Sequence, residues 1–389
     1  MTAPQDTTVF GTRGSEATEV NSLLDHDDLI EAIRNPPRST GPVIMPDFFL
    51  DHFIIGPSFS EFIEDVERVA QQGGGNIIGR RHLIRRGGNS VNTASALLRL
   101  GLRPTLIVKT SPQGAELLRA LVDPHLDLSH VHTDGLLSAT VSIEVDYNGR
   151  RTNIMVSDSG SAADFSREDL DETDIEAIRA APLVALLCLN HNRDPARLAR
   201  EIFSLVRDVS GAYTFMDIGD PSSRPEILGP LVREVLCEGF VDILSVNENE
   251  VKWIARELGL RGKELTDKCE DPDEWLRCAR FVAQETGSRV DLHTPFFSAT
   301  LSSELEVVIP TFRVDVRVTC GAGDAWNAGD IFGTLLGISP DQRVVLANAV
   351  GALYVSSSEA EHPTLSDVEQ FLRSNPSLTK LGNKLLKPP

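Results

Sequence analysis

Short apolar runs alternate with amphipathic stretches along most of the chain. Residues 183–189, 213–218 and 243–246 are short, largely apolar runs of strand length, which is typical of strands buried on both faces. Residues 90–100 and 248–258 have the residue pattern of helices. Because runs of these two kinds alternate, the pattern predicts an α/β fold with a mainly parallel sheet and helices on both of its faces.

The same pattern gives further elements outside these runs. They are strands over residues 43–55 and 106–109, and helices over residues 21–35, 58–72, 114–122 and 324–336.

One stretch departs from this alternation. Residues 139–145 and 152–156 alternate apolar and polar positions around Asn148-Gly149. An Asn-Gly pair supplies the positive φ angles of a tight hairpin turn. A two-stranded ribbon has no place in a parallel sheet, so we expect it to project from the sheet edge as a lid.

Composition and charge exclude several classes of protein. The chain has 389 residues, with 37 Lys+Arg against 57 Asp+Glu and a net charge of -20, which argues against a nucleic-acid partner. No apolar run reaches the roughly 18 residues of a membrane helix, and residues 1–19 lack a signal-peptide core. The 5 cysteines show no paired or zinc-type spacing, which predicts a reducing, cytoplasmic location. The acidic excess fits a salt-rich cytoplasm, and the preference for Arg over Lys fits GC-rich coding equally well.

A glycine-rich turn is the sharpest chemical feature. An apolar, strand-like run over residues 314–318 leads into Gly321, Ala322 and Gly323, whose backbone N–H groups would form an anion site at the start of a helix. Asp324 falls in the first turn of that helix. A carboxylate beside an anion site suits a base that deprotonates a hydroxyl attacking a phosphoryl group. The alternative is that Asp324 only caps the helix.

A second small-residue helix follows another pair of glycines. Gly87 and Gly88 precede residues 90–100, and Asn89 and Asn92 fall in the first turn. The Asn92 amide offers a donor and an acceptor, which suits a sugar hydroxyl. The alternative is a capped helix packed tightly on a sheet.

These two motifs, in this order and at this separation, resemble the signatures of the ribokinase-like, or PfkB, family of carbohydrate and nucleoside kinases. The resemblance extends from about residue 46 to residue 372. It implies a three-layer α/β/α sandwich with a mainly parallel central sheet and a small β lid. It also implies nucleotide-dependent phosphoryl transfer to a hydroxyl of a sugar-like acceptor, with ATP or ADP as donor and Mg²⁺ as cofactor.

The resemblance also implies a domain organisation. We expect an N-terminal extension over residues 1–40, a kinase domain over residues 41–375 and a tail over residues 376–389. The lid would comprise about residues 51–88 and 139–157. A homodimer formed through the lid is one expected assembly, since lid edges in this family often pair between subunits.

Roles for individual residues follow from the same resemblance. Asp324 matches the catalytic base, and Gly321, Ala322 and Gly323 match the anion hole. The acceptor-binding positions are Asp51, Gly87, Gly88 and Asn92. Nucleotide-binding positions are Thr294, Asn348 and Gly351. Asn247 and Glu250 match the Asn-x-x-Glu motif that positions Mg²⁺, with Glu250 acting through water; a capping pair on a helix start is the alternative.

Two positions depart from the family pattern. Val318 stands where many relatives have an Asp that helps a monovalent-cation site, so dependence on K⁺ is not carried over. The usual Thr-x-Gly turn near the nucleotide reads Thr294-Pro-Phe, which leaves the choice between ATP and ADP open.

Paired arginines suggest the class of acceptor. They are Arg80-Arg81, Arg85-Arg86 and Arg150-Arg151. Because an Arg fork matches a phosphate, we hypothesise an acceptor that already carries phosphate, such as ribose 1-phosphate. Surface ion pairs are the alternative for these arginines. The competing functions are a nucleoside or free-sugar kinase and a catalytically inactive sugar-binding regulator on the same fold.

Overall fold

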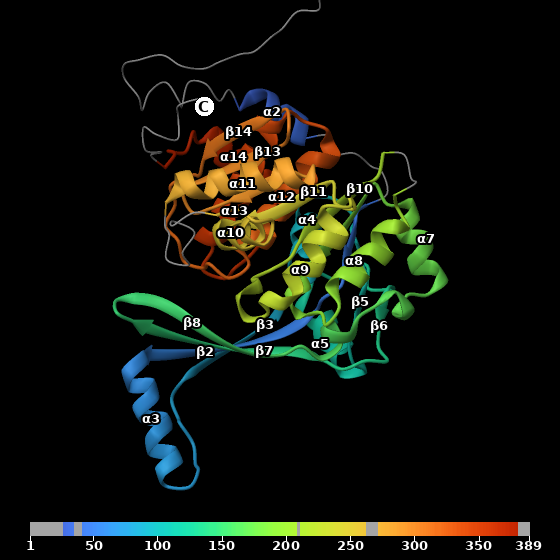
Figure 1. Cartoon of the computed structure of the whole chain (residues 1–389). Coiled ribbons are helices and arrows are strands. Elements are labelled where there is room, and N and C mark those ends of the chain that lie inside the picture. Colours follow the sequence, from blue (N-terminus) through green and yellow to red (C-terminus); the bar gives the residue numbers. More distant parts are fainter. Residues whose placement is uncertain (1–25, 35–40, 208–210, 262–270, 380–389) are drawn as a thin grey trace, which may run out of the picture.

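A mainly parallel sheet forms the centre of the molecule. The computed structural model describes residues 26–34, 41–207, 211–261 and 271–379, apart from the side chains of Pro57, Arg150 and Arg151. The strand order is β14-β13-β12-β11-β10-β9-β1-β4 (Figure 1). Neighbours from β4 to β12 are parallel, whereas β13 and β14 add to the edge in antiparallel pairing. The strands are β1 (Val43–Met45), β4 (Thr105–Leu106), β9 (Leu183–Leu187), β10 (Tyr213–Asp217), β11 (Ile243–Asn247), β12 (Arg289–His293), β13 (Phe297–Leu301) and β14 (Glu306–Pro310).

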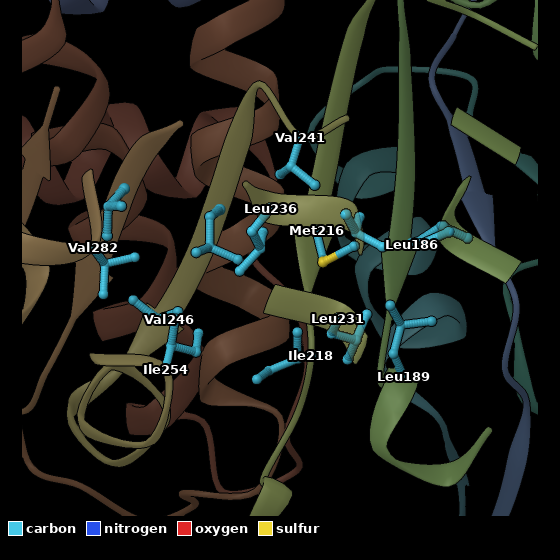
Figure 2. Close-up of a cluster of buried hydrophobic side chains, with 14 of the residues drawn as sticks. Leu186, Leu189, Met216, Ile218, Leu231, Leu236, Val241, Val246, Ile254 and Val282 are labelled. Carbon is cyan, nitrogen blue, oxygen red and sulfur yellow. The ribbon is translucent and has the colours of Figure 1, made fainter. Parts of the chain in front are cut away.

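Helices cover both faces of this sheet, because its strands are apolar on both sides. In β9, Val184 and Leu186 pack into one hydrophobic cluster, and Ala185 and Leu187 pack into the other. The first cluster is shown in Figure 2, where Leu186 lies among apolar side chains of neighbouring strands and helices. The predicted three-layer α/β/α sandwich is therefore confirmed.

Each cluster has its own set of helices. On the face of Figure 2 they are α7 (Glu172–Ala180), α8 (Pro195–Ser204), α9 (Leu228–Leu231), the π-helical η5 (Val232–Leu236), α10 (Glu248–Glu257) and α11 (Pro272–Thr286). On the other face they are α2 (Asp27–Ile33), α4 (Asn89–Arg99), α5 (Pro112–Leu121), α12 (Ala322–Leu336), α13 (Pro340–Ser356) and α14 (Leu365–Arg373). Shorter elements are β5 (Val108–Lys109), β6 (Val131–His132), α6 (Gly160–Asp164), η1 (Arg167–Asp169), η2 (Leu189–His191), η3 (Pro221–Ser223) and η4 (Pro225–Ile227).

A second sheet, which we call the lid sheet, has the strand order β3-β2-β7-β8. Its strands are β2 (Phe49–Ser58), β3 (Arg81–Gly87), β7 (Ser138–Tyr147) and β8 (Arg150–Asp158). The predicted hairpin is confirmed: β7 and β8 pair antiparallel across Asn148 and Gly149, whose φ angles are 54° and 76°. The predicted helix over 58–72 is also present as α3 (Phe59–Gln71), which extends away from the central layers in Figure 1.

Three predicted strands differ from the structure. The run over 43–55 divides into β1 and β2, which belong to different sheets, because the chain turns at Pro46 and Asp47 and leaves the central sheet. The run over 106–109 is likewise divided between β4 and β5. Residues 314–318 form no strand, since the backbone N–H groups of Arg317 and Val318 both donate to the Val355 carbonyl and pair with no neighbouring strand.

The predicted terminal segments are partly outside the described residues. Of the 1–40 extension, only 26–34 is described, and its helix α2 buries Leu29, Ile30 and Ile33 in the core. Arg34 then pairs with Glu369 of α14 at 2.5 Å. This part of the extension therefore belongs to the packed core, while the domain boundaries remain predictions. No helix among the described residues is long and apolar enough to cross a bilayer.

Candidate active site

The chemically interesting side chains lie at one edge of the central sheet. Asp47 follows β1, and Asp217, Asn247 and His293 end β10, β11 and β12. The carboxyl ends of parallel strands form the edge at which α/β proteins bind ligands. The start of α12 meets this edge, since the Asn327 amide donates to Asp217 at 2.7 Å.

The glycine-rich turn shapes the start of α12. Gly321 precedes the helix with a φ of 85°, and a Cβ there would lie 2.5 Å from the Tyr354 hydroxyl, so only glycine fits. One predicted donor is already engaged, because the Ala322 N–H donates to the Thr319 carbonyl at 3.2 Å. The amides of Gly323 and Asp324, which have no partner four residues earlier in a helix, are the ones left for an anion.

Asp324 is buried in this turn beside the second motif. Its side chain accepts a hydrogen bond from the Asn92 amide at 2.9 Å, so the two motifs, 232 positions apart, meet in the structure. Burial raises the pKa of Asp324 well above its ordinary value, and the charges of Asp217, Asp47 and Asp51 raise it further. The carboxylate therefore has a high affinity for a proton, which is the property required of a base.

Asp47 fixes the start of α4 and was missed in the sequence. Its carboxylate accepts from the N–H groups of Asn89 and Ser90 at 3.0 and 2.9 Å and from the Ser90 hydroxyl at 2.5 Å. Burial raises the pKa of Asp47 to about 6 despite these donors. Gly88, with a φ of 89°, would place a Cβ 2.9 Å from this carboxylate. Asp47 therefore holds the glycine hinge and the acceptor helix together.

Asp51 reaches the same region from the lid sheet. A Cβ at Gly87 would lie 2.3 Å from the Asp51 carboxylate, so that glycine makes room for it. Burial, with the charge of Asp47 as a second cause, raises the pKa of Asp51 to about 7. Asp51, Gly87, Gly88 and Asn92 thus lie together, as their predicted shared role requires.

A cavity of about 660 Å³ lies between the lid sheet and the central layers. Asp51, Phe53 and Arg86 line it from the lid strands, and Asn92 and Tyr354 line it from helices of the core. Of the acceptor residues proposed from the sequence, Asp51, Arg85, Arg86 and Asn92 therefore face a space large enough for a small ligand, whereas Gly87, Gly88 and the proposed base Asp324 are not among the residues that line it.

The paired arginines separate in the structure. Arg85 and Arg86 line the cavity, and neither forms an ion pair with a described carboxylate. Arg80 does not join them, because it pairs with Asp65 of α3 at 2.5 Å. Arg150 and Arg151 lie at the start of β8, but their side chains are outside the described part of the chain.

Arg86 is partly buried at the wall of the cavity. Its Nε is buried without a described hydrogen-bond partner. Burial lowers the pKa of Arg86, with the charges of Tyr354 and Asp324 acting in the opposite direction. A partly buried cation without a counterion is unfavourable, and an anionic ligand would supply the missing negative charge.

Asn247 and Glu250 form the capping box that was the alternative interpretation. The Asn247 side chain accepts from Asn249 and Glu250 amides, and the two Glu250 oxygens accept from the backbone and side-chain N–H groups of Asn247 at 2.9 and 2.8 Å. Burial raises the pKa of Glu250 well above its ordinary value, and the charges of Asp217 and Asp220 act in the same direction. This concentration of carboxylate oxygens is the ligand chemistry that Mg²⁺ prefers.

The predicted nucleotide residues have structural partners. Thr294 closes the turn between β12 and β13, where its hydroxyl contacts the Phe297 backbone at 2.7 Å. The Asn348 side chain bonds to Ser298, Trp326 and the Pro310 carbonyl, so its hydrogen-bonding groups are engaged. A Cβ at Gly351 would meet nothing closer than Trp326 at 3.8 Å. The three lie near β13 and α13, but their contacts do not distinguish a nucleotide role.

His293 is a residue that the sequence analysis did not single out. It ends β12, and its Cε1 would lie 3.3 Å from a Cβ at Gly323. Its Nε2 is buried without a partner in the described chain, and burial lowers its pKa to about 4. A neutral imidazole therefore stands beside the amides at the start of α12. The sequence analysis predicted no strand over residues 289–293, so no signal there pointed to His293.

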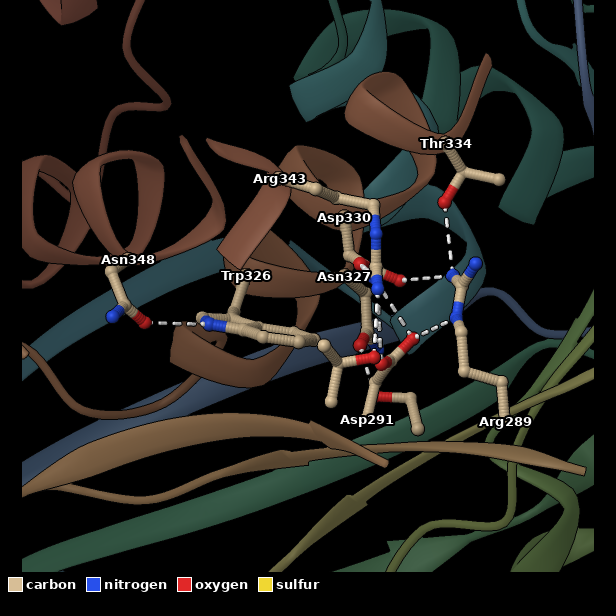
Figure 3. Close-up of polar contacts among 10 residues, drawn as sticks. Arg289, Asp291, Trp326, Asn327, Asp330, Thr334, Arg343 and Asn348 are labelled. Atoms are coloured by element: carbon tan, nitrogen blue, oxygen red, sulfur yellow. Dashed lines mark hydrogen bonds and ion pairs between the residues drawn. The ribbon is translucent and has the colours of Figure 1, made fainter. Parts of the chain in front are cut away.

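A buried ionic network holds α12 against the sheet (Figure 3). Arg343 of α13 contacts Asp330 of α12 and Asp291 of β12, and Arg289 contacts Asp291 at 2.8 Å and the Thr334 hydroxyl at 2.9 Å. These contacts join β12 and α13 to the second half of α12, at Asp330 and Thr334. The helix that carries Asp324 is therefore fixed in position.

Comparison with known proteins gives a consistent assignment. The family model described as pfkB family carbohydrate kinase matches residues 54–367. No curated protein sequence matches the chain significantly. Among solved structures, Arabidopsis thaliana ribokinase complexed with ribose and ATP is similar at 17% identity and a TM-score of 0.65, over 86% of this chain and 99% of that one.

Two further structures share the fold. Xylella fastidiosa fructokinase with bound ATP has 15% identity and a TM-score of 0.62, over 86% of this chain and 99% of its own. Methanocaldococcus jannaschii nucleoside kinase has 13% identity and a TM-score of 0.60, over 86% of this chain and 98% of its own. At these identities the likeness establishes the fold alone.

Proposed function

Because this chain belongs to the PfkB family of carbohydrate kinases, we propose that it transfers a phosphoryl group from ATP or ADP to a hydroxyl of a sugar phosphate, with ribose 1-phosphate as the leading candidate. The observation that carries the acceptor class is Arg86, a partly buried guanidinium that lines the cavity without a described counterion. A phosphate on the acceptor would supply that counterion.

The surroundings of the cavity favour this class over a neutral acceptor. The donor nucleotide is itself anionic, and the buried carboxylates Asp47, Asp51 and Asp324 lie near one another. A second phosphate entering such a site needs a local cation to offset the repulsion. Arg85 and Arg86 supply two guanidinium groups at the cavity wall.

A nucleoside acceptor fits less well. Among the described residues that line the cavity, the aromatic rings are Phe53 and Tyr354. The Arg85 guanidinium already lies over Phe53 at 5.8 Å, and Tyr354 is stacked on His362 with ring centroids 4.8 Å apart. Each ring therefore has one face covered, which reduces the surface on which a base would stack.

Asp324 is the proposed base. In this proposal Asp51 and the Asn92 amide orient the acceptor hydroxyl. Asp324 takes the proton of this hydroxyl while the hydroxyl oxygen attacks the terminal phosphorus of the donor. The amides of Gly323 and Asp324 donate to the phosphoryl oxygens as negative charge moves between the nucleotide and the acceptor. Closure of the lid sheet over the cavity excludes water, which would otherwise compete as the acceptor.

Mg²⁺ is the cofactor that the family implies, and the acidic ends of β10 and β11 have suitable donors. Asp217 and Glu250 are buried carboxylates whose charges interact, and Asp220 is close enough to act on Glu250. They would hold the ion directly or through water. Bound there, Mg²⁺ would neutralise charge on the donor phosphates.

The acceptor class is tested with an Arg86→Gln variant and a panel of acceptors. We expect at least a tenfold increase in KM for ribose 1-phosphate, the size of effect that loss of one charge-assisted contact gives. The KM for ribose should hardly change. Arg81→Gln is the matched control, since Arg81 lies on the same strand but outside the cavity lining. Equal changes for both acceptors would exclude a phosphate contact at Arg86.

The same panel separates the competing functions. Assays with ATP and with ADP identify the donor, and ribose, adenosine and ribose 1-phosphate represent the three acceptor classes. A preference for adenosine would replace the phosphosugar proposal by a nucleoside kinase. No turnover with any pair, together with measurable acceptor binding, would indicate an inactive regulator.

We also propose that the lid sheet pairs two copies of the chain. β8 is an edge strand, and Ile154, Met155 and Val156 are exposed along it. An exposed apolar edge is a ready template for pairing with a second strand. Light scattering of the purified chain should give a dimer mass, and Met155→Asp should shift it to a monomer; a monomeric parent chain would end the proposal.

A further inference from the structure

A second group of ionisable side chains lies on β6 and at the start of α7. His130 and His132 are separated by one residue, and both imidazoles reach the carboxylate of Asp174. His130 Nδ1 lies 2.7 Å from one Asp174 oxygen, and His132 Nε2 lies 2.7 Å from the other. The Asp174 side chain is 0% exposed. None of these residues lines the cavity described above.

Asp171 completes the group from the N-cap of α7. One of its oxygens accepts from the Thr173 N–H, the Thr173 hydroxyl and the Asp174 N–H at 2.8, 2.7 and 3.0 Å. Its second oxygen has no hydrogen-bond donor among the described residues. The ligand atoms of His132, Asp171 and Asp174 all lie within 4.8 Å of one another. One imidazole nitrogen and two carboxylates thus converge from two elements.

The local charge favours a cation at this place. The carboxylate of Asp127 interacts electrostatically with His130, and that of Asp134 interacts with His132. The Lys109 ammonium group is already bound by Asp169 at 2.6 Å and by Asp134 at 3.3 Å. The buried Asp174 carboxylate lies 2.7 Å from one ring nitrogen of each histidine and accepts from the Asp171 N–H at 2.9 Å, and a bound cation would place a full positive charge against it.

We propose that His132, Asp171 and Asp174 bind a divalent transition-metal ion, with Zn²⁺ as the best match. Imidazole nitrogen and carboxylate oxygen in a set of three are a usual protein contribution to a zinc site, with water in the fourth position. Mg²⁺ and Ca²⁺ are poor matches, because they take oxygen ligands and seldom imidazole. The ion takes the place of the hydrogen between His132 Nε2 and Asp174, and His132 then carries its proton on Nδ1.

His130 has a different role in this site. Its Nδ1–H donates to the Asp174 oxygen that does not face His132, so it orients the ligating carboxylate. Such outer contacts are usual around metal ligands, and their loss weakens metal binding by roughly 10–100-fold. His130 is therefore a positioning residue.

The site would act as a staple between distant parts of the chain. β6 and α7 are joined by the β7–β8 hairpin and by α6, so His132 and Asp174 are 42 residues apart. An ion that binds the folded chain but not the unfolded chain raises the free energy of unfolding, and the gain grows with the logarithm of the ion concentration. The expected signature is zinc-dependent thermal stability that does not depend on the kinase reaction.

Zinc binding to the chelator-treated full chain tests the proposal. Equilibrium dialysis is done with excess Mg²⁺ present, so that oxygen-rich sites elsewhere are filled. We expect one Zn²⁺ per chain to be lost in His132→Gln, and about tenfold weaker binding in His130→Gln. Co²⁺ in place of Zn²⁺ should give an intense visible band, typical of low coordination with nitrogen ligation, which His132→Gln abolishes.

His125 provides the matched control. It also lies beside a carboxylate, Asp123, at 2.8 Å, but it is exposed and outside the group. His125→Gln should therefore bind zinc as the parent chain does. Asp171→Asn, at an exposed position, tests the site with little risk to folding, and circular dichroism verifies each variant. A parent chain that retains no zinc, or equal zinc binding in the parent and His132→Gln, would show a hydrogen-bonded cluster only.

Discussion

The central sheet and the lid sheet both contribute to the candidate active site but are built differently. In β9 of the central sheet every residue from Leu183 to Leu187 is buried, whereas in β8 of the lid sheet residues 152–158 are exposed. Asp324 belongs to the first region and Asp51 to the second. The difference shows that the proposed base Asp324 is held by the packed central layers. The acceptor contact Asp51 instead lies on a sheet that buries few side chains.

The ion pairs of the two regions show the same contrast. Arg343 is 4% exposed and contacts Asp291 and Asp330, both 0% exposed. Arg80 and Asp65 of the lid pair at 2.5 Å but are 24% and 25% exposed. Water screens the exposed Arg80–Asp65 pair but not the buried contacts of Arg343. Losing Arg343 should therefore change the free energy of unfolding much more than losing Arg80.

The largest expected effect is on catalysis and comes from the core side. Asp324→Asn should lower kcat by about 10³-fold, since loss of a positioned base costs 10²–10⁴-fold. The KM of the acceptor should change little, because Asn keeps the contact geometry with Asn92. Steady-state kinetics measure both constants. Asp315→Asn, at an exposed carboxylate, is the control, and near-normal kcat in Asp324→Asn would remove the assignment.

The next effect is on stability. Arg343→Met should lower the free energy of unfolding by about 3–5 kcal/mol, because it removes the more deeply buried of the two cations that pair with Asp291 and Asp330 and leaves both carboxylates to Arg289 alone. The matched lid variant, Arg80→Met, should cost about 0–1 kcal/mol. Urea denaturation gives both values. Similar losses in the two variants would mean that the lid is as firmly packed as the core.

A smaller, pH-dependent effect is expected at Asp51. Its pKa is raised to about 7 in the folded protein, so the folded state binds the proton more tightly than the unfolded chain. The folded state therefore loses stability as the pH rises from about 4 to about 7, and the loss is complete above that range. Asp51→Asn removes the ionisation, so its melting temperature should exceed that of the parent by a few degrees at pH 8 and match it near pH 4. An unchanged difference across this range would contradict the raised pKa.

The smallest effect is expected at the far end of the lid. Ser58 caps α3 through a capping box with Glu61, and Thr364 caps α14 through one with Asp367. Thr364→Ala should lower the global free energy of unfolding by about 1 kcal/mol, because α14 is packed on the core. Ser58→Ala should leave it unchanged and only speed amide hydrogen exchange within α3, which buries no described residue. A global loss in both variants would show that α3 folds together with the core.

The central layers were predictable because their local and tertiary preferences agree. The runs of β9, β10 and β11 are mainly apolar because these strands are buried on both faces, and small residues in α4 and α12 allow those helices to approach each other. The meeting of Asn92 with Asp324 followed from a family resemblance. No residue spacing would have shown it.

The missed features depend on contacts that a linear pattern does not contain. Residues 314–318 are apolar enough for a strand, but no neighbouring strand offers them a hydrogen-bonding edge. Asp47 fell inside the strand predicted over residues 43–55, and its role depends on amides more than 40 positions away. The hydrogen bonds of Asn348 could not be predicted for the same reason, because the partners of its side chain come from three separate elements.

The crowded carboxylates also bear on how long the protein survives in a cell. Burial raises the pKa of Asp47, Asp51, Asp217 and Asp324, and the charges of the other three carboxylates raise the pKa of Asp324 further, so the site without a ligand opposes folding. Cations and substrates that enter the site relieve this opposition, and at about 100 times its Kd a ligand adds about 2.7 kcal/mol of stability. Proteases act on the unfolded fraction, so the abundance of the enzyme would follow the supply of its substrates. Pulse proteolysis with and without the magnesium–nucleotide complex would measure the protection that the ligand gives. Equal half-lives would show that degradation of the protein does not depend on occupancy of its site.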